Sequence, residues 1–482
     1  MTITSQLISS SAILFLTKII HRGLGLISTL ILARILVPED FGLVAIILLT
    51  IQFFEIIGET GSEQYILQKD NVSNIELSSA WSLNVIIKSV IWLIFVALVP
   101  LIVDFYDNPN LKLPLYIISF ILIIRPLVNP GVILLKKNLQ YKPIFNLSVI
   151  QKIVSFTIVM SIVYVYPSFW ALIAGDIAAE IIYVAGSYFI HTFRPQMTFK
   201  AIKEQWAFSQ WMLFKSILGF TRSRIDLLMV TKLFNTSILG QFHVIKNITV
   251  ILGLDILAPI LDPLVTTFAK VKNDAKKLTY RVQITFAILM AVTIPITVFF
   301  YFFPFVIIDF LLGDKWKNTY DLMSALSIMF LTLSAGWFLN NCFVALGNVK
   351  SLFVFDLVSL IFTFTILYLL GQNDIIEFTL IRSALAVIVT LSFFYYLGRF
   401  INFSYIRMTL LLLPVLLSSV LAAYLTNEVK VIRFEWSILN LAFLGSVYFV
   451  SYFISLILTS TIFIGKLEEF KHIKDAIFNM FK

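Results

Sequence analysis

The sequence is short of charged residues and has a single cysteine. Charged residues make up 13% of the 482 residues, hydrophobic residues make up 59%, and the mean hydropathy is +0.95. A soluble globular domain carries roughly twice that share of charged residues, so the composition excludes one. Cys342 has no cysteine partner in the chain and lies in an apolar segment, so we expect a buried thiol. The composition therefore indicates a polytopic membrane protein.

The sequence also lacks the signatures of soluble enzymes. It contains no Gly-rich phosphate loop followed by Lys and Ser or Thr, no His-Glu-x-x-His motif and no Gly-x-Ser-x-Gly motif. Its four histidines are scattered, which argues against a metal site. We expect no enzymatic activity, no cofactor and no bound metal, and without a nucleotide site ATP is not the direct energy source. Alternating strand patterns are absent too, which excludes an outer-membrane barrel.

Long apolar segments are abundant. A membrane-spanning helix needs ~20 apolar residues, and short polar breaks separate about fourteen such segments, which predicts an all-α polytopic fold. The N-terminus has no basic residue before its first apolar segment, which is too long for a signal peptide, so we expect an uncleaved first helix. The predicted spans are residues 9–36, 41–66, 78–103, 113–135, 145–166, 169–192, 206–233, 240–268, 281–304, 320–346, 350–370, 375–398, 405–426 and 437–464.

Basic residues fall mainly in alternate loops between these spans. The net charge is +9 and the sequence pI is about 9.3. Lys and Arg favour cytoplasmic loops, so the bias predicts that both termini lie in the cytoplasm. This bias accounts for the positive charge, and we assign no basic cluster to nucleic acid. The bases expected on the cytoplasmic side are Lys136, Lys137, Lys142, Arg194, Lys200, Lys203, Lys270, Lys272, Lys276, Lys277, Arg281, Arg399, Arg407, Lys466, Lys471, Lys474 and Lys482.

One stretch of sequence occurs twice. Residues 29–44 end an apolar segment with Arg34 and restart it before Gly42, and residues 228–242 repeat this order with Lys232 and Gly240. The repeat favours duplication of a six-span unit, although a snorkelling base and a turn glycine also occur in unrelated membrane hairpins. Duplication predicts two pseudo-symmetric six-helix lobes with a cavity between them. The predicted parts are an N-terminal lobe at 1–200, a C-terminal lobe at 201–400, and two additional spans with an amphipathic cytoplasmic tail at 401–482.

Several bases lie inside predicted spans. A base at mid-membrane costs at least ~2.5–3.5 kcal/mol, so each one needs a partner, a wet cavity or a substrate. The first and seventh spans, which the repeat pairs, carry bases at similar depth, and facing clusters of cations would bind an anion. The substrate-binding candidates are His21, Arg22, Lys88, Arg125, Arg222, Arg224 and Lys246.

Acidic residues share the predicted spans with these bases. Glu55 and Glu59 lie one helical turn apart, as do Asp176 and Glu180, so each pair occupies one face of a helix. Carboxylates at this depth can carry protons or bind Na⁺ during transport. The other interpretation is that acids and bases neutralise one another, as Asp226 would a neighbouring arginine. The ion-coupling candidates are Glu55, Glu59, Asp176, Glu180, Asp226 and Asp255.

Four stretches resemble the bacterial polysaccharide-export flippases of the multidrug/oligosaccharidyl-lipid/polysaccharide exporter superfamily. Residues 33–44 are similar to the first hairpin of that family. Residues 124–141 resemble its fourth span and the loop after it, and residues 169–175 resemble the start of its sixth. Arg224-Ile225-Asp226, followed by Lys232 and by Leu239-Gly240, resembles its seventh. The resemblance covers the first eight spans and weakens beyond about residue 280.

The resemblance implies a function as well as a fold. It implies fourteen helices in two six-helix lobes plus two further helices, alternating access, and an undecaprenyl-pyrophosphate-linked glycan as the cargo of surface polysaccharide biosynthesis in the bacterial cytoplasmic membrane. It also implies coupling to an H⁺ or Na⁺ gradient, and it assigns Arg22, Arg222 and Arg224 to the pyrophosphate. The glutamates of the second span, Glu55, Glu59 and Glu63, depart from the family pattern.

Two other functions stay open at this point. A cation-coupled multidrug antiporter of the same superfamily would prefer an acidic cavity, which Glu55, Glu59, Asp176 and Glu180 could supply. A membrane polysaccharide polymerase or ligase would need a sizeable external loop, and no loop here exceeds roughly 15 residues. The expected partners are the lipid-linked oligosaccharide, membrane lipids, H⁺ or Na⁺, and a polysaccharide polymerase.

Overall fold

The computed structural model describes residues 3–250, 264–269, 271, 274–401, 404–432 and 434–464. Within these ranges all regular elements are α-helices or short 3-10 helices, with no strand, which confirms the all-α class. The chain divides into two compact units, residues 1–243 and 244–482, which are described separately below. The six-span lobes expected to meet at residue 200 are a division by repeat rather than by contact, and they stay a prediction.

Twelve helical segments in the described part of the chain are long and apolar enough to cross a membrane. They correspond to all the expected spans except the seventh and the eighth, so the multi-pass character is confirmed. The seventh coincides with α10 (Ile202–Leu233), whose charges, including Arg222, Arg224 and Asp226, are too many for an apolar span. The eighth begins in α11 (Thr236–Val250) and continues outside the described residues, so the count of fourteen stays a prediction.

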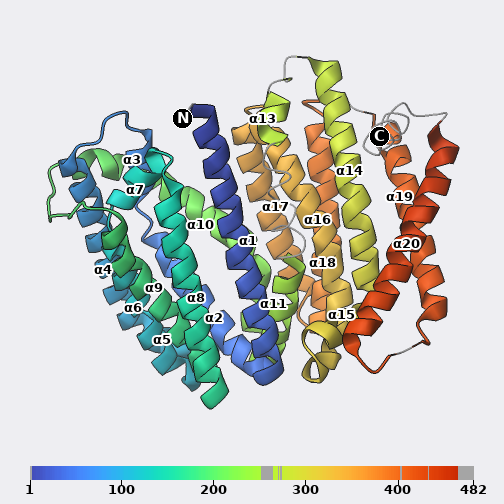
Figure 1. The fold of residues 1–482 in the computed structure, drawn as a ribbon, viewed down its shortest axis with the longest axis horizontal. Coiled ribbons are helices and arrows are strands. Elements are labelled where there is room, and N and C mark those ends of the chain that lie inside the picture. The colour runs from blue at the N-terminus through green and yellow to red at the C-terminus, as the bar shows by residue number, and fades with distance from the viewer. Residues whose placement is uncertain are drawn as a thin grey trace. The chain divides into compact units, whose positions relative to one another are not determined.

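The first unit consists of long helices that pack side by side, with several short helices among them (Figure 1). Among its contacts are those of α8 with α9, α1 with α8, and α10 with α2. Its helices, besides α10 and the first part of α11, are α1 (Ile3–Ile35), α2 (Pro38–Ile57), α3 (Ser62–Gln68), α4 (Asn74–Tyr106), η1 (Pro109–Leu111), α5 (Lys112–Ile118), α6 (Phe120–Ile124), η2 (Arg125–Leu127), α7 (Gly131–Lys137), α8 (Tyr141–Val165) and α9 (Trp170–Ile190).

The fourth expected span is broken into short pieces. Proline has no N–H for the helix ladder, and its ring clashes with the preceding turn. Pro126 lies in the 3-10 turn η2, and Pro130 is the residue before α7. The break leaves Arg125 at the start of η2 rather than in the interior of a regular helix.

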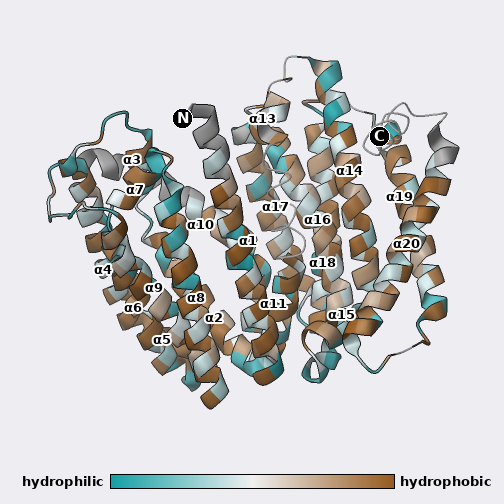
Figure 2. Ribbon diagram, in the orientation of Figure 1, coloured by the Kyte–Doolittle hydropathy of each residue, from teal (hydrophilic) through white to brown (hydrophobic). Residues whose placement is uncertain are grey.

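Apolar side chains cover the outside of the long helices. Figure 2 shows hydrophobic residues along most of their length and hydrophilic residues at many of the ends and loops. On α4, for example, Leu93 is 60% exposed and Leu101 is 63% exposed. Large exposed apolar surface is unfavourable in water, so it fits helices that face lipid.

An extended segment, residues 191–201, joins α9 to α10 and is fastened by buried side chains. The side-chain amide of Asn129 donates to the carbonyls of His191 (3.1 Å) and Phe193 (2.8 Å). Further along, the backbone N–H of Thr198 donates to Ser82 Oγ at 3.0 Å, and that of Ala201 donates to Ser79 Oγ at 3.2 Å. These polar side chains form hydrogen bonds with backbone N–H and C=O groups that have no partner within a helix.

The second unit is built on α14 and α16. Helix α16 contacts α14 and α18, while α19 and α20 pair with each other and pack on α14. Its described helices are α13 (Leu264–Ala269), α14 (Ala275–Phe302), α15 (Pro304–Leu311), η4 (Asp314–Thr319), α16 (Tyr320–Ala345), α17 (Val349–Leu370), α18 (Ile375–Leu397), α19 (Tyr405–Val429) and α20 (Ser437–Ile464).

Two tyrosines of α20 donate hydrogen bonds to α14 around Pro295, and one of them replaces the bond that the proline removes. Pro295 lies inside α14 and has no N–H to donate to the carbonyl of Ala291, one turn earlier. The Tyr452 hydroxyl donates to that carbonyl at 2.7 Å, and the Tyr448 hydroxyl donates to the Pro295 carbonyl at 2.9 Å. The last helix is thereby tied to α14 at its kink-prone position.

Cys342 is buried in α16, and its thiol is free, as expected.

Candidate functional site

The first set of basic side chains in the site lies where α1 contacts α8. The half-buried ring of His21 lies against α8, where its Nε2 is 3.1 Å from the Ser148 carbonyl and so carries the proton. Lys152 lies one turn further along α8, and its Nζ is 4.0 Å from where a Cβ on Gly25 would lie. Its charge acts on both His21 and the neighbouring Arg22. The contact therefore gathers three basic side chains within one membrane-spanning pair.

Helix α10 brings a fourth base to this group. Arg224 is half-buried and interacts electrostatically with Arg22 of α1 and with Asp226 on its own helix. Asp226 is only 1% exposed, and its carboxylate accepts the Leu227 N–H at 2.9 Å. Arg222 lies one turn before Asp226 with an exposed side chain. We name His21, Arg22, Lys152 and Arg224 the cationic cluster.

A second group of charges is centred on Arg125. Its guanidinium forms ion pairs with Glu55 of α2 and with Glu180 of α9. Lys88 of α4 is 9% exposed, and its ammonium donates to the Glu55 carbonyl at 3.0 Å. Because Arg125 and Lys88 already have partners inside this group, which we name the paired cluster, they are the weaker candidates for binding a substrate.

Helix α9 connects the two clusters. Asp176 and Glu180 are one turn apart, as their spacing predicted, and they share a helix face. Glu180 binds Arg125, and the charge of Asp176 interacts with Lys152 of the cationic cluster and with Arg125, Glu55 and Glu180 of the paired cluster. Asp176 therefore links the two clusters electrostatically.

The remaining candidates are not members of the two clusters. Glu59 lies after the end of α2 at Ile57, so the helix face that it was expected to share with Glu55 does not form, but it is close enough to Lys88 of the paired cluster to interact with it electrostatically. Glu63, on α3 rather than on the second span, forms an ion pair with Lys136 at 2.7 Å. Lys246 is half-buried on α11 and belongs to the second unit, and Asp255 lies outside the described residues. Among the residues searched, no group of three or more His, Cys, Asp or Glu side chains could hold a metal ion.

Lys152 is the residue of this site that the sequence analysis did not single out. It lies in the middle of the predicted span 145–166, and a base at that depth is itself a signal of function. Its proximity to Arg22, by contrast, depends on the packing of α1 on α8 and is not visible in one sequence.

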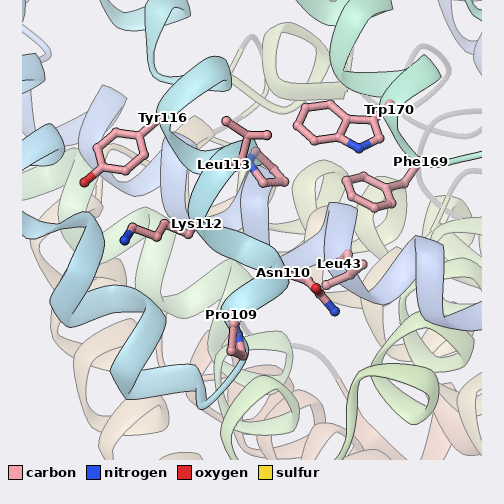
Figure 3. Close-up of a pocket in the computed structure, with 9 residues that line it drawn as sticks. Leu43, Pro109, Asn110, Lys112, Leu113, Tyr116, Phe169 and Trp170 are labelled. Carbon is pink, nitrogen blue, oxygen red and sulfur yellow. The ribbon is translucent and has the colours of Figure 1, made fainter.

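A pocket of about 710 Å³ lies elsewhere in the first unit, beside the loops that precede α5 and α9. Phe169 and Trp170 stack in its wall, with ring centroids 5.3 Å apart. Figure 3 shows Lys112 and Tyr116 pointing away from this aromatic pair. None of the charged candidates lines the pocket, so it is separate from the cationic cluster.

Comparison with known proteins identifies the family. A family model described as "Polysaccharide biosynthesis protein" matches residues 31–321, which is more than half of the chain. The chain belongs to this polysaccharide biosynthesis family. The match includes α2 to α10 and therefore the paired cluster and, from the cationic cluster, Lys152 and Arg224.

Curated relatives of the chain have names from polysaccharide biosynthesis. Lipopolysaccharide biosynthesis protein WzxC from Escherichia coli is 22% identical over 74% of this chain and 73% of its own length. Succinoglycan biosynthesis transport protein ExoT from Rhizobium meliloti is 20% identical over 64% of this chain. The match spans 62% of the ExoT protein, which is less than two thirds of its length.

Two solved transporter structures share the fold of this family member. The lipid II flippase MurJ, in an inward closed conformation, superposes with a TM-score of 0.73 and 16% identity, covering 94% of this chain and 99% of that one. An inward-facing multidrug resistance MATE transporter gives a TM-score of 0.54 and 11% identity, covering 80% and 95%. At these identities the likeness establishes the fold, which is that of a multi-helix membrane transporter.

Proposed function

We propose that this protein moves an undecaprenyl-pyrophosphate-linked oligosaccharide across the bacterial cytoplasmic membrane for the assembly of a surface polysaccharide. The observation that carries the proposal is the cationic cluster, in which bases on α1 and α8, two helices apolar enough to span a membrane, gather with Arg224 of α10. Membership of the polysaccharide biosynthesis family and the names of the relatives support the same cargo class.

The chemistry of the cargo explains why cations are needed. A pyrophosphate cannot enter hydrocarbon unaided, because the loss of its hydration is too costly. Arginine presents a planar fork of donors that matches phosphate oxygens, so Arg22 and Arg224 are the leading candidates to bind the headgroup. Arg222 and Lys246 are further candidates, and the polyprenyl tail would stay in the lipid.

Transport needs a change of access as well as a binding site. In this account two six-helix lobes rock about the bound headgroup and open the cavity first to one side of the membrane and then to the other. Both termini lie in the cytoplasm, as the distribution of loop bases predicts. The protein performs no covalent chemistry on its cargo, and a polysaccharide polymerase would act on it after transport.

An ion gradient is the proposed energy source. Among the ion-coupling candidates in the described part of the first unit, Glu59, Asp176 and Asp226 are proposed to take up H⁺ or Na⁺, because Glu55 and Glu180 both bind Arg125. This engagement of two of the four leading acids by one arginine also argues against the acidic cavity of a multidrug antiporter.

Export of surface polysaccharide tests the proposal. The host is a flippase-null bacterium with glycan genes that match this protein. We expect the wild type to restore export, and we expect Arg22→Ala plus Arg224→Ala to leave the lipid-linked unit inside. Lys142→Ala, at the exposed start of α8, serves as the matched control. Restored export by the double variant would refute the cationic site, and acid-dependent efflux of a cationic dye without export would favour the antiporter.

A further inference from the structure

Lys152 occupies an unusual position for a lysine. It lies near the middle of α8, a helix long and apolar enough to span the membrane, and its side chain is half-buried. The side chain faces α1, where Gly25 leaves room beside the ammonium, and the Ser148 carbonyl one turn away bonds to His21. The ammonium is thus held inside the unit and does not snorkel to a helix end.

The titratable groups around Lys152 come from two other helices. Helix α1 contributes His21 and Arg22, and α9 contributes Asp176. Within the described part of the chain, the Lys152 ammonium forms no ion pair within 4.0 Å and no hydrogen bond. Asp176 influences it electrostatically without reaching it.

Arg125, in the same unit, differs from Lys152 because carboxylates of the protein bind its charge directly. Two carboxylates from two helices bind its guanidinium directly. Lys152 has an acid nearby and yet keeps its three N–H donors unengaged, at a depth where unengaged donors are costly. The difference indicates that the donors of Lys152 serve a group that is not part of the protein.

We propose that Lys152 is a further substrate-binding residue, whose ammonium binds a phosphate oxygen of the lipid-linked substrate beside Arg22. Asp176 is its counter-ion in the empty protein and loses this role when the phosphate binds. This inference rests on the proposed function. It adds a compact point charge on α8 to the planar guanidinium groups of α1 and α10.

The competing explanation is that Lys152 only neutralises Asp176. A double-mutant cycle separates the two explanations, because a residue that only balances a charge becomes dispensable once that charge is removed. The full-length purified protein in lipid nanodiscs is titrated with undecaprenyl pyrophosphate. Undecaprenol, which has the same tail and no phosphate, is the control ligand.

Lys152→Met should weaken binding of undecaprenyl pyrophosphate about tenfold or more, as expected for a lost charged hydrogen bond, and should leave undecaprenol binding unchanged. Asp176→Asn alone should not weaken binding, and Lys152→Met plus Asp176→Asn should bind as weakly as Lys152→Met. Wild-type affinity in Lys152→Met, or its return in the double variant, would overturn the inference. Lys152→Gln replaces Lys152→Met if the latter does not fold, and Lys142→Met is the matched surface control.

Arg22→Ala distinguishes failure of this inference from failure of the proposed function. If Arg22→Ala weakens binding while Lys152→Met does not, only the role of Lys152 is wrong. If the wild type binds undecaprenyl pyrophosphate no better than undecaprenol, the proposed function itself fails.

Discussion

At the scale of single residues, the paired cluster shows that the ion-pair partners of a charged residue cannot be predicted from one sequence. The sequence marked Arg125, Glu55 and Glu180 as intramembrane charges, but it assigned the arginine to the substrate and the acids to ion coupling. The structure brings them together from three segments that are far apart in the chain. A single sequence shows which charges lie in membrane spans, where they are costly. The partner of each charge depends on tertiary packing.

Removing Arg125 should therefore destabilise the protein. Arg125→Ala leaves the carboxylates of Glu55 and Glu180 without their shared partner, which should cost about 1.5–3 kcal/mol of unfolding free energy. Thermal unfolding of the purified protein in detergent measures this loss. Glu55→Gln plus Glu180→Gln in the same background should recover part of it. An Arg125→Ala variant as stable as the wild type would show that the pairs contribute nothing.

His191, just after the end of α9, should make stability depend on pH. Burial lowers its pKa below the usual 6.5, and the positive charge of Arg194 lowers the pKa further. The neutral ring accepts the Phe193 N–H at Nδ1, 3.1 Å away. Since the folded-state pKa is the lower one, the stability due to His191 is complete above about pH 6.5 and is lost as the pH falls through the folded-state value.

We expect the wild type to lose about 0.5–1.5 kcal/mol more than His191→Asn between about pH 7.5 and about pH 5, because asparagine keeps an acceptor that does not titrate. Thermal unfolding at the two pH values gives the difference. Equal losses in the two proteins would exclude His191 as the titrating group.

At the scale of elements, the two glycines that the repeat pairs lie against each other. A Cβ on Gly42 of α2 would fall 1.9 Å from the Thr236 carbonyl oxygen, and a Cβ on Gly240 of α11 would fall 1.7 Å from the Pro38 carbonyl oxygen. Both glycines belong to the first unit, and both neighbouring atoms are backbone, so neither can move aside easily. The starts of α2 and α11 can approach this closely only where no side chain intervenes.

Alanine at either glycine should separate the two helix starts. We expect Gly42→Ala and Gly240→Ala each to cost about 1–3 kcal/mol, as overpacking of a tight contact does. Gly23→Ala on α1 is the matched control, because nothing lies within 4 Å of its Cβ position and alanine suits a helix interior better. Unfolding in detergent compares the three variants. Equal stability for all three would contradict the close approach.

The sequence predicted the elements better than their contacts. The spans follow from the length of apolar runs, which the membrane itself sets. The break of the fourth span at Pro126 follows from proline chemistry, but its effect, which is to place Arg125 between two acids, does not. The hydrogen bonds of Tyr448 and Tyr452 to α14 could not be predicted either, because they join residues more than 150 positions apart.

At the scale of the whole molecule, the transport account joins a transporter fold with a cationic cluster in the first unit. Arg22 and Arg224, which the sequence analysis proposed from their depth, the repeat and the family resemblance, are near enough to interact, and Lys152 joins them from α8. Composition was sufficient to predict a polytopic membrane protein, and the resemblance to flippases supplied the transport function and the cargo class. The sequence could not predict that these bases lie near one another, because their proximity depends on the packing of α1 on α8 and on the position of α10.

Transport of the cargo can be measured with the purified protein in liposomes. The liposomes contain undecaprenyl-pyrophosphate-linked saccharide in both leaflets, and a membrane-impermeant hydrolase removes saccharide from the outer one. With the wild type, we expect the inner-leaflet saccharide to become accessible as well, whereas Arg22→Ala plus Arg224→Ala should leave it protected and Lys142→Ala should behave as the wild type. Protection in the wild type, or equal access in the double variant, would contradict the account.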